Sequence, residues 1–497
     1  MTAREAERRD FLMRASAGTC VPVARTFPSD CLTPVMLLKR MRASGEESFL
    51  LESVEGGEAV ARYTFLGTAP SGRLVVRGDE TMLERSGKRN RCEGAPMSVL
   101  ERLVRKEGFA ADPDLPPLVC GAVGYLSYDA VRLLERIPDR HPRESEMPDA
   151  LFLVYDAIVA FDHPRQRLLL LTTIEGTEET EVEGRVDEAI ARLDGLECFL
   201  TAPDPPRARA GRENPRFTPL MARERFLDAV AKAREAIAAG EIYQAVLSQR
   251  WTARLDIDPF DVYRALRALN PSPYLFYLET REGILLGSSP EMLVRCRGRS
   301  VETRPIAGTA PRGRTTDEDA ALAAALLADP KERAEHVMLV DLARNDLGRV
   351  CEVGSVRVPR YGAVEKFSHV QHLVSEVRGT LASGRSAADV LAACFPAGTL
   401  TGAPKIRAME LIDELEAARR GVYGGAVGYL DAAGNCDMAI AIRMAVVENG
   451  LCRVQAGAGI VADSVAEKEY REAEAKAEAL FRAVALAREW VAEGRLP

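Results

Sequence analysis

Short strand-like apolar runs recur along the chain and predict that much of it forms β-sheet. Before residue 200 these runs are SFLLES, GRLVVRG, LFLVYDAIVAFD and RLLLLTTI. In the second half, the pattern predicts consecutive strands, which we interpret as an antiparallel meander, at 274–279, 283–288, 291–296 and 300–304. Further strands are predicted at 243–251, 368–378, 424–431, 437–448 and 451–461.

Helices separate these groups of strands. The pattern predicts a helix near 179–195, another that begins at residue 221, and later ones at 316–328, 331–348, 386–394, 403–418 and 464–494. The segment RRDFLMR, residues 8–14, imitates a twin-arginine export signal, but no apolar region follows it, so we expect a surface helix. Strands interrupted by pairs of helices favour an α+β fold over regular βαβ alternation.

One segment divides the chain. Residues 201–215, TAPDPPRARAGRENP, are rich in proline, arginine and alanine and lack apolar periodicity, which is typical of a linker. We therefore expect an N-terminal domain at 1–200 and a C-terminal domain at 216–497. The hexapeptide GAVGYL occurs in both, at 121–126 and 425–430, and is consistent with paired strands in related surroundings.

Composition narrows the function. Hydrophobic residues make up 47% of the 497 and charged residues 28%, as in an ordinary soluble enzyme. The net charge of −8 argues against a nucleic-acid or anionic-membrane surface, but it allows a small acidic substrate. No apolar run approaches the roughly 18 residues that span a bilayer. The ten cysteines are scattered without metal spacing, so we expect reduced thiols in a cytoplasmic protein.

The strongest candidate for chemistry is the segment at 454–476. It reads as a strand, a glycine turn and a helix that places Glu469 and Glu472 on one face, and an upstream helix carries Glu332 and Glu335 at the same spacing. Two such helices can offer four carboxylates to one Mg²⁺ ion. The alternative is that these acids only favour helix starts, with Ser464 and Glu467 forming a capping box.

A single arginine lies in the apolar run MAIAIRMAVV, residues 438–447. If this run is one strand, Arg443 shares a face with Ala441 and Ala445, and these small neighbours leave room for a ligand carboxylate. An internal salt bridge explains the arginine almost as well.

Two further positions are candidates. On a strand, His372 shares a face with Val370 and Val374 and should point inward, although most inward histidines are only hydrogen-bonded core residues. The loop at 395–416 leads into an amphipathic helix whose first turn could bind an anion. Helix capping by Thr399 or Thr401 explains that loop equally well.

These segments, in this order, resemble the chorismate-utilising enzymes, and among them the large subunits (component I) of anthranilate synthases. The resemblance covers nearly all of 220–485. The matching motifs are GSSPEMLVR, RPIAGTAPRG, EHVMLVDLARNDLGRV, HVQHLVSEVRGTL, FPAGTLTGAPK, RRGVYGGAVGYLD, AIAIRMAV and VQAGAGIVADSV. It implies large antiparallel sheets packed face to face with helices outside, in α/β/β/α layers.

The resemblance also implies a reaction. Chorismate and ammonia would give anthranilate and pyruvate through an amino-deoxyisochorismate intermediate, as the first committed step of tryptophan biosynthesis. Ammonia would come from a separate glutamine amidotransferase subunit, so we expect a hetero-oligomer. A region before residue 200 would regulate the enzyme or bind this partner.

Site residues follow from the motifs that match. Mg²⁺ would be held by Glu335 and Glu472, with Glu332 and Glu469 beside them. The resemblance assigns catalysis and substrate binding to these residues: Glu291 as the acid for the departing C4 hydroxyl, His372 in pyruvate elimination, Thr399 in the pocket, and Tyr423, Arg443, Gly457, Ala458, Gly459 and Lys476 around the substrate.

Two positions discriminate within the superfamily. Aminodeoxychorismate synthases typically carry a nucleophilic lysine where this chain has Ala307, and isochorismate and salicylate synthases typically carry a water-activating lysine where it has Gln244. Direct attack by ammonia remains. An enzyme that stops at the amino intermediate, an aminodeoxychorismate synthase without the lysine, and a non-catalytic regulatory subunit are the competing interpretations.

Two motifs look like the tryptophan-sensing elements of the same family, LLES at 50–53 and NPSPYLFYLE at 270–279. The resemblance therefore implies feedback inhibition by L-tryptophan, bound by Ser53, Asn270, Pro271, Ser272, Tyr274 and Phe276.

Overall fold

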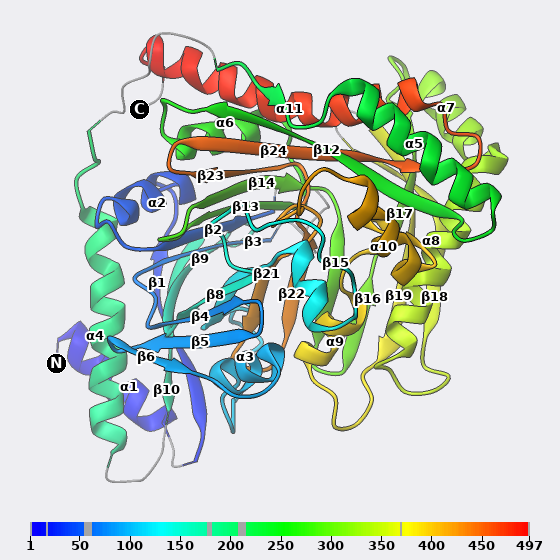
Figure 1. Ribbon diagram of the computed structural model, residues 1–497. Coiled ribbons are helices and arrows are strands. Elements are labelled where there is room, and N and C mark those ends of the chain that lie inside the picture. The colour runs from blue at the N-terminus through cyan, green and yellow to red at the C-terminus, as the bar shows by residue number, and fades with distance from the viewer. Residues whose placement is uncertain are drawn as a thin grey trace.

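Two large antiparallel sheets stand at the centre of the computed structural model (Figure 1). The structure describes residues 2–15, 18–53, 62–175, 181–206, 215–367 and 370–495. The first sheet has twelve strands. Eleven of them run in the order β1 (Cys20–Pro28), β10 (Arg167–Glu175), β9 (Ala157–Asp162), β3 (Tyr63–Thr68), β2 (Ser48–Glu52), β13 (Tyr274–Glu279), β14 (Ile284–Ser289), β23 (Met444–Glu448), β24 (Leu451–Ile460), β12 (Gln244–Arg254) and β11 (Thr218–Pro219). The short strand β20 (Gly402–Ala403) pairs with β12.

The second sheet also has twelve strands. Eleven of them run in the order β17 (Ile306–Pro311), β19 (Val370–Thr380), β16 (Ser300–Thr303), β15 (Met292–Arg297), β22 (Cys436–Ile440), β21 (Ala426–Asp431), β7 (Gly121–Leu126), β8 (Ala150–Tyr155), β4 (Gly72–Arg77), β5 (Glu80–Arg85) and β6 (Lys88–Arg91). Strand β18 (Arg357–Lys366) pairs with β19.

The sheets pack face to face. Buried side chains from both of them, among them Phe49, Tyr125, Leu151, Leu169 and Phe276, form one apolar core between the layers. Because both faces of each sheet are covered, many strands are apolar on both sides instead of alternating.

Helices cover the outer faces (Figure 1). On the first sheet, one core joins the strands to α1 (Ala3–Arg14), α2 (Pro34–Arg42), α4 (Val182–Thr201), α6 (Pro259–Leu269) and α11 (Ala466–Ala492). On the second sheet, another core joins them to α3 (Pro96–Val104), α8 (Pro330–Gly348) and α9 (Ala387–Cys394). The remaining helices are α5 (Arg223–Ala238), α7 (Thr316–Ala328) and α10 (Lys405–Leu415), with 3₁₀ turns η1 (Tyr128–Leu133) and η2 (Gly398–Leu400). The predicted α+β fold in α/β/β/α layers is confirmed.

Both halves of the chain contribute to both sheets. In the first sheet β2 pairs with β13, and in the second β7 pairs with β21. The two GAVGYL segments are therefore paired strands, with Gly124 opposite Gly428. The predicted boundary at 201–215 divides the chain but not its hydrogen-bonded sheets, and residues 207–214 lie outside the described ones.

Two strand predictions are wrong in the same way. The predicted meander at 274–304 is two separate hairpins, because β14 belongs to the first sheet and β15 to the second. The predicted strand at 437–448 is likewise broken between β22 and β23, which lie in different sheets. An apolar run does not reveal which sheet each of its ends joins.

Sequence reasoning also missed the strands β17 and β18. Strand β18 lies at an edge and is largely exposed, so it lacks an apolar face that sequence reasoning could detect. Among the described residues, no helix combines the length and the apolar character needed to cross a membrane.

Candidate active site

The chain passes from one sheet to the other at two places, between β14 and β15 and between β22 and β23. These two crossings lie side by side. The Ile440 N–H donates to the Glu291 carbonyl oxygen at 3.0 Å, and the Ser288 N–H donates to the Arg443 carbonyl oxygen at 3.0 Å. Both crossings place a charged side chain where the sheets separate. They define the candidate site as the region around Glu291 and Arg443.

Glu291 is half-buried between β14 and β15, and protein atoms surround its carboxyl group. Loss of hydration raises its pKa from the ordinary value of 4.5 to about 8, although the Thr399 hydroxyl and the Lys476 ammonium group act against this shift. The buried Thr399 Oγ1 has no other partner among the described residues. A carboxyl group that keeps its proton near neutral pH is suited to general acid catalysis.

Arg443 does not lie on a strand face with Ala441 and Ala445, because it occupies the crossing itself and has φ = 51°. Burial lowers the pKa of its guanidinium group, while Tyr423 and Glu472 raise it. No acid of the described chain lies within ion-pair distance of Arg443, so the internal salt bridge is absent there. Its guanidinium group remains available for a ligand carboxylate.

His372 lies on β19, opposite a bulge in β17. Its Nδ1 is 2.7 Å from the Gly308 carbonyl oxygen, which fixes Nδ1 as the protonated nitrogen and leaves Nε2 to accept a proton. Burial lowers the pKa of His372, and the nearby Arg443 lowers it further. A neutral imidazole close to Arg443 can remove or relay a proton.

Gly308 was missed as a site residue. It has φ = 62° at the register shift between Ala307 and Thr309, and this bulge aims its carbonyl group at His372. The signal was a glycine inside the strand-forming PIAGT motif, which is typical of a bulge.

The four glutamates come from α8 and α11 and influence one another. Glu472 raises the pKa values of Glu332, Glu335 and Glu469 through charge repulsion, after the larger effect of burial. Lys476 Nζ lies 2.7 Å from Glu472 and balances part of this charge. Within the described ranges, no three His, Cys, Asp or Glu side chains converge as metal ligands.

The donor set nevertheless suits Mg²⁺, which is usually held by one or two carboxylates and several waters. Because Glu472 is close enough to raise the pKa values of the other three acids, the group presents negative charge that a cation would neutralise. The predicted capping box at Ser464 and Glu467 is wrong, because α11 begins after Val465 and has no side-chain cap.

Strand β24 supplies backbone groups to the same region. Gly457, Ala458 and Gly459 pair with β12 on one side, whereas the pairing of β24 with β23 stops at Val454. Their other edge is therefore open to a ligand. Lys476 Nζ donates to the Gly457 carbonyl oxygen at 2.9 Å.

The two discriminating positions lie beside these groups. Gln244 begins β12, and a Cβ atom on Gly459 would lie 2.6 Å from its Nε2. Ala307 precedes Gly308 in the β17 bulge and pairs with Leu373 on β19.

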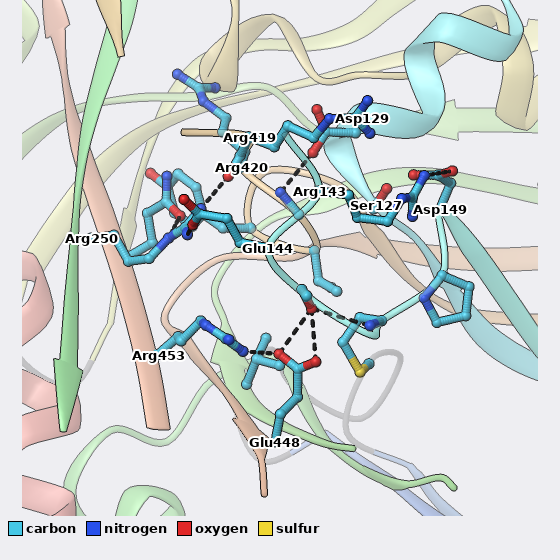
Figure 2. Close-up of a pocket in the computed structure, with 18 of the residues that line it drawn as sticks. Ser127, Asp129, Arg143, Glu144, Asp149, Arg250, Arg419, Arg420, Glu448 and Arg453 are labelled. Carbon is cyan, nitrogen blue, oxygen red and sulfur yellow. Dashed lines mark hydrogen bonds and ion pairs between the residues drawn. The ribbon is translucent and has the colours of Figure 1, made fainter. Parts of the chain in front are cut away.

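A separate cavity, lined in part by Tyr423, also contains many charged side chains (Figure 2). Each of its arginines is paired with an acid: Arg143 with Asp149, Arg250 with Glu144, Arg419 with Asp139, Arg420 with Glu416 and Arg453 with Glu448. Acids of the protein therefore neutralise the positive charge of these arginines, whereas none of the described acids forms an ion pair with Arg443.

The predicted effector residues are only partly brought together. Ser53, Tyr274 and Phe276 line a cavity of about 340 Å³ between the sheets. Asn270, Pro271 and Ser272 do not line it, because this segment ends α6; the Asn270 Nδ2 donates to Ser288 Oγ at 3.1 Å.

Comparison with known proteins agrees with this geometry. The family model described as chorismate binding enzyme matches residues 46–482. The chain belongs to this family. Anthranilate synthase component 1 of Mycobacterium bovis is 46% identical over 99% of this chain and 98% of its own length. The Thermus thermophilus protein of the same name is also 46% identical, over 94% of this chain and 98% of its own.

Solved structures agree with the family assignment. Anthranilate synthase component I from Streptococcus pneumoniae superimposes with a TM-score of 0.75 at 36% identity, covering 92% of this chain and 99% of its own. The Escherichia coli menaquinone-specific isochorismate synthase MenF has a TM-score of 0.70 at 19% identity, covering 97% and 98%, and it supports the shared fold alone. The resemblance stated from the sequence motifs is confirmed.

Proposed function

We propose that this chain converts chorismate and ammonia into anthranilate and pyruvate. The observation that carries the proposal is the pairing of Glu291, whose pKa is raised to about 8, with the unpartnered Arg443 at adjacent sheet crossings. The names of the 46%-identical relatives support it. Ala307 and Gln244 leave no lysine at the two positions that would direct related enzymes to other products.

Substrate binding follows from the charges. Chorismate carries two carboxylates, and Arg443, together with Tyr423, would bind the one on the enolpyruvyl group. Backbone N–H groups on the open edge of β24 near Gly457 and Gly459 would add hydrogen bonds, and Lys476 would add positive charge.

The ring carboxylate would lie near the glutamates. Glu335 and Glu472 would hold Mg²⁺, with Glu332 and Glu469 contributing partly through water. The ion would supply positive charge that neutralises the ring carboxylate.

In the first half-reaction, ammonia forms a bond to C2 as the ring double bonds shift and the C4–oxygen bond breaks. The Glu291 carboxyl group protonates the departing hydroxyl, so that it leaves as water. Thr399 orients this carboxyl group. In the second half-reaction, His372 helps to remove the C2 proton while pyruvate leaves and the ring becomes aromatic.

Ammonia would be supplied by a glutamine amidotransferase subunit, which the "component 1" names of the relatives suggest. We further propose that L-tryptophan inhibits the enzyme from the cavity lined by Ser53, Tyr274 and Phe276. An aromatic lining with buried polar groups is suited to an indole that carries a charged backbone.

Product analysis tests this function. The purified chain, chorismate, Mg²⁺ and ammonium salt at mildly alkaline pH should give anthranilate and pyruvate by mass spectrometry. An amino compound that keeps its enolpyruvyl group would instead place the chain among enzymes that stop at the intermediate. Chorismate recovered unchanged would favour a regulatory subunit.

A further inference from the structure

A small cavity of about 40 Å³ lies behind Glu291 and Thr399. The residues that line it include Glu291, Thr399, Arg304, Leu342, Ala343 and Asp346. None of the residues that we assign to the metal or to the chorismate carboxylates is among them. Glu291 and Thr399 therefore form the wall between this cavity and the substrate.

The walls of this cavity are mostly apolar and are held in place on three sides. Helix α8 contributes Leu342 and Ala343, the η2 segment contributes Gly398, and β15, β16, β22 and the end of α9 contribute further residues. Besides Glu291, the one acid in the lining is Asp346. Both of its oxygens lie 2.9 Å from Lys405 Nζ, so its charge is neutralised.

One end of the cavity reaches toward the surface. Leu342 is only half-buried, and the Arg304 side chain is 25% exposed, although it is paired with Glu365 at 2.6 Å. The cavity thus connects the Glu291 carboxyl group with the partly exposed side chains of Leu342 and Arg304. Its volume exceeds the roughly 10–15 Å³ that one water requires, and its polar ends offer hydrogen-bond partners.

The proposed reaction needs such a route. In each turnover Glu291 gives one proton to the C4 oxygen, while the nitrogen that has bonded to C2 loses one proton. The reaction is balanced overall, but the two protons are exchanged at different atoms. As long as substrate or product fills the site in front, the Glu291 carboxylate can regain its proton only from another direction.

We propose that water in this cavity returns the proton to Glu291 and exchanges with bulk solvent past Leu342 and Arg304. The inference rests on the proposed function, since it assumes that Glu291 acts as the acid. Ala343 and Leu342 act only by leaving the route open, and they touch neither the substrate nor the metal.

Filling the cavity tests this inference. Ala343→Leu and, from the half-buried side, Leu342→Phe should each lower kcat about tenfold. The KM values for chorismate and ammonia should stay unchanged, and the solvent deuterium isotope effect on kcat should exceed that of the parent. Ala231→Leu is the matched control, because it makes the same change at an exposed site in α5.

Thermal unfolding of each variant separates loss of the route from loss of the fold, and Leu342→Phe keeps the test decisive if Ala343→Leu does not fold. The inference would be overturned by a folded variant whose cavity is filled but whose kcat and isotope effect equal those of the parent. A rise in the KM for ammonia alone would also overturn it, because the cavity would then carry ammonia. A parent enzyme that forms no anthranilate would contradict the proposed function instead.

Discussion

At the scale of single residues, Arg443 is a cation for which the described chain provides no ion-pair partner. By contrast, Arg344 is exposed on α8 and has an ion-pair partner in Asp341 at 3.4 Å. Burial without an ion pair costs free energy, so a bound carboxylate accounts for Arg443 better than a structural role does.

Replacing Arg443 should therefore weaken substrate binding. Arg443→Ala is expected to raise the KM for chorismate by roughly 10- to 100-fold, the loss of a hydrogen bond to a charged group. Steady-state kinetics at saturating ammonium checks this, with Arg344→Ala as the control. An unchanged KM would contradict the assignment.

His372 has a different role from Arg443. Because its Nδ1 is fixed by Gly308, its Nε2 is the available base, and the elimination should depend on it more than the amination does. His372→Ala is expected to slow pyruvate release by about 100-fold or more and to let the amino intermediate accumulate. Chromatography of quenched reactions measures this; full-rate anthranilate formation without an intermediate would refute it.

At the scale of elements, the β17 bulge connects His372 to α8, the helix that carries Glu332 and Glu335. A Cβ atom on Gly308 would lie 2.9 Å from Glu332 Oε2 and 3.1 Å from Leu326 Cδ1. The glycine in this bulge therefore permits α7 and α8 to pack closely against β17.

Gly308→Ala should combine two effects, about 1–2 kcal/mol of backbone strain and displacement of Glu332. Gly354→Ala is the matched control, because Gly354 has φ = 77° but nothing within 4 Å. We expect similar strain in both variants by denaturant unfolding, but a large loss of kcat only in Gly308→Ala. Equal activity in the two variants would show that the bulge does not organise the site.

Elements also show what the sequence could predict. Helices such as α7 and α8 were predicted within one residue, because periodicity and caps are local. The crossings at Glu291 and Arg443 were not, since sheet membership depends on partners far along the chain. The motifs nevertheless identified both residues, and the missed features, Gly308 and the cavity behind Glu291, arise only from tertiary packing.

At the scale of the whole molecule, the cavity lined by Ser53, Tyr274 and Phe276, which we propose as the tryptophan site, shares strands with the candidate active site. Strand β22 runs from Asp437, in the cavity lining, to Ile440, whose N–H is bound to Glu291. A ligand in the cavity can therefore influence the crossing if it binds two arrangements of these strands with different affinity.

Filling the cavity that we propose as the tryptophan site should remove inhibition by tryptophan while leaving catalysis intact. Ser53→Phe is expected to keep its activity in millimolar tryptophan, because the larger side chain occupies the cavity of about 340 Å³. Inhibition curves for parent and variant measure this effect. A parent that tryptophan does not inhibit would remove the effector assignment.

The proton carried by Glu291 is central to the proposed reaction. Its pKa is raised to about 8, so the carboxyl group is protonated and active below that pH and loses its proton as the pH rises above it. The decisive measurement is the single-turnover rate of chorismate consumption against pH, at constant free ammonia, for the parent and Glu291→Gln. We expect the parental rate to fall above about pH 8, and the variant to be about 100-fold slower or more, without that fall. A variant that consumes chorismate at the parental rate, or that keeps the same fall, would contradict the account.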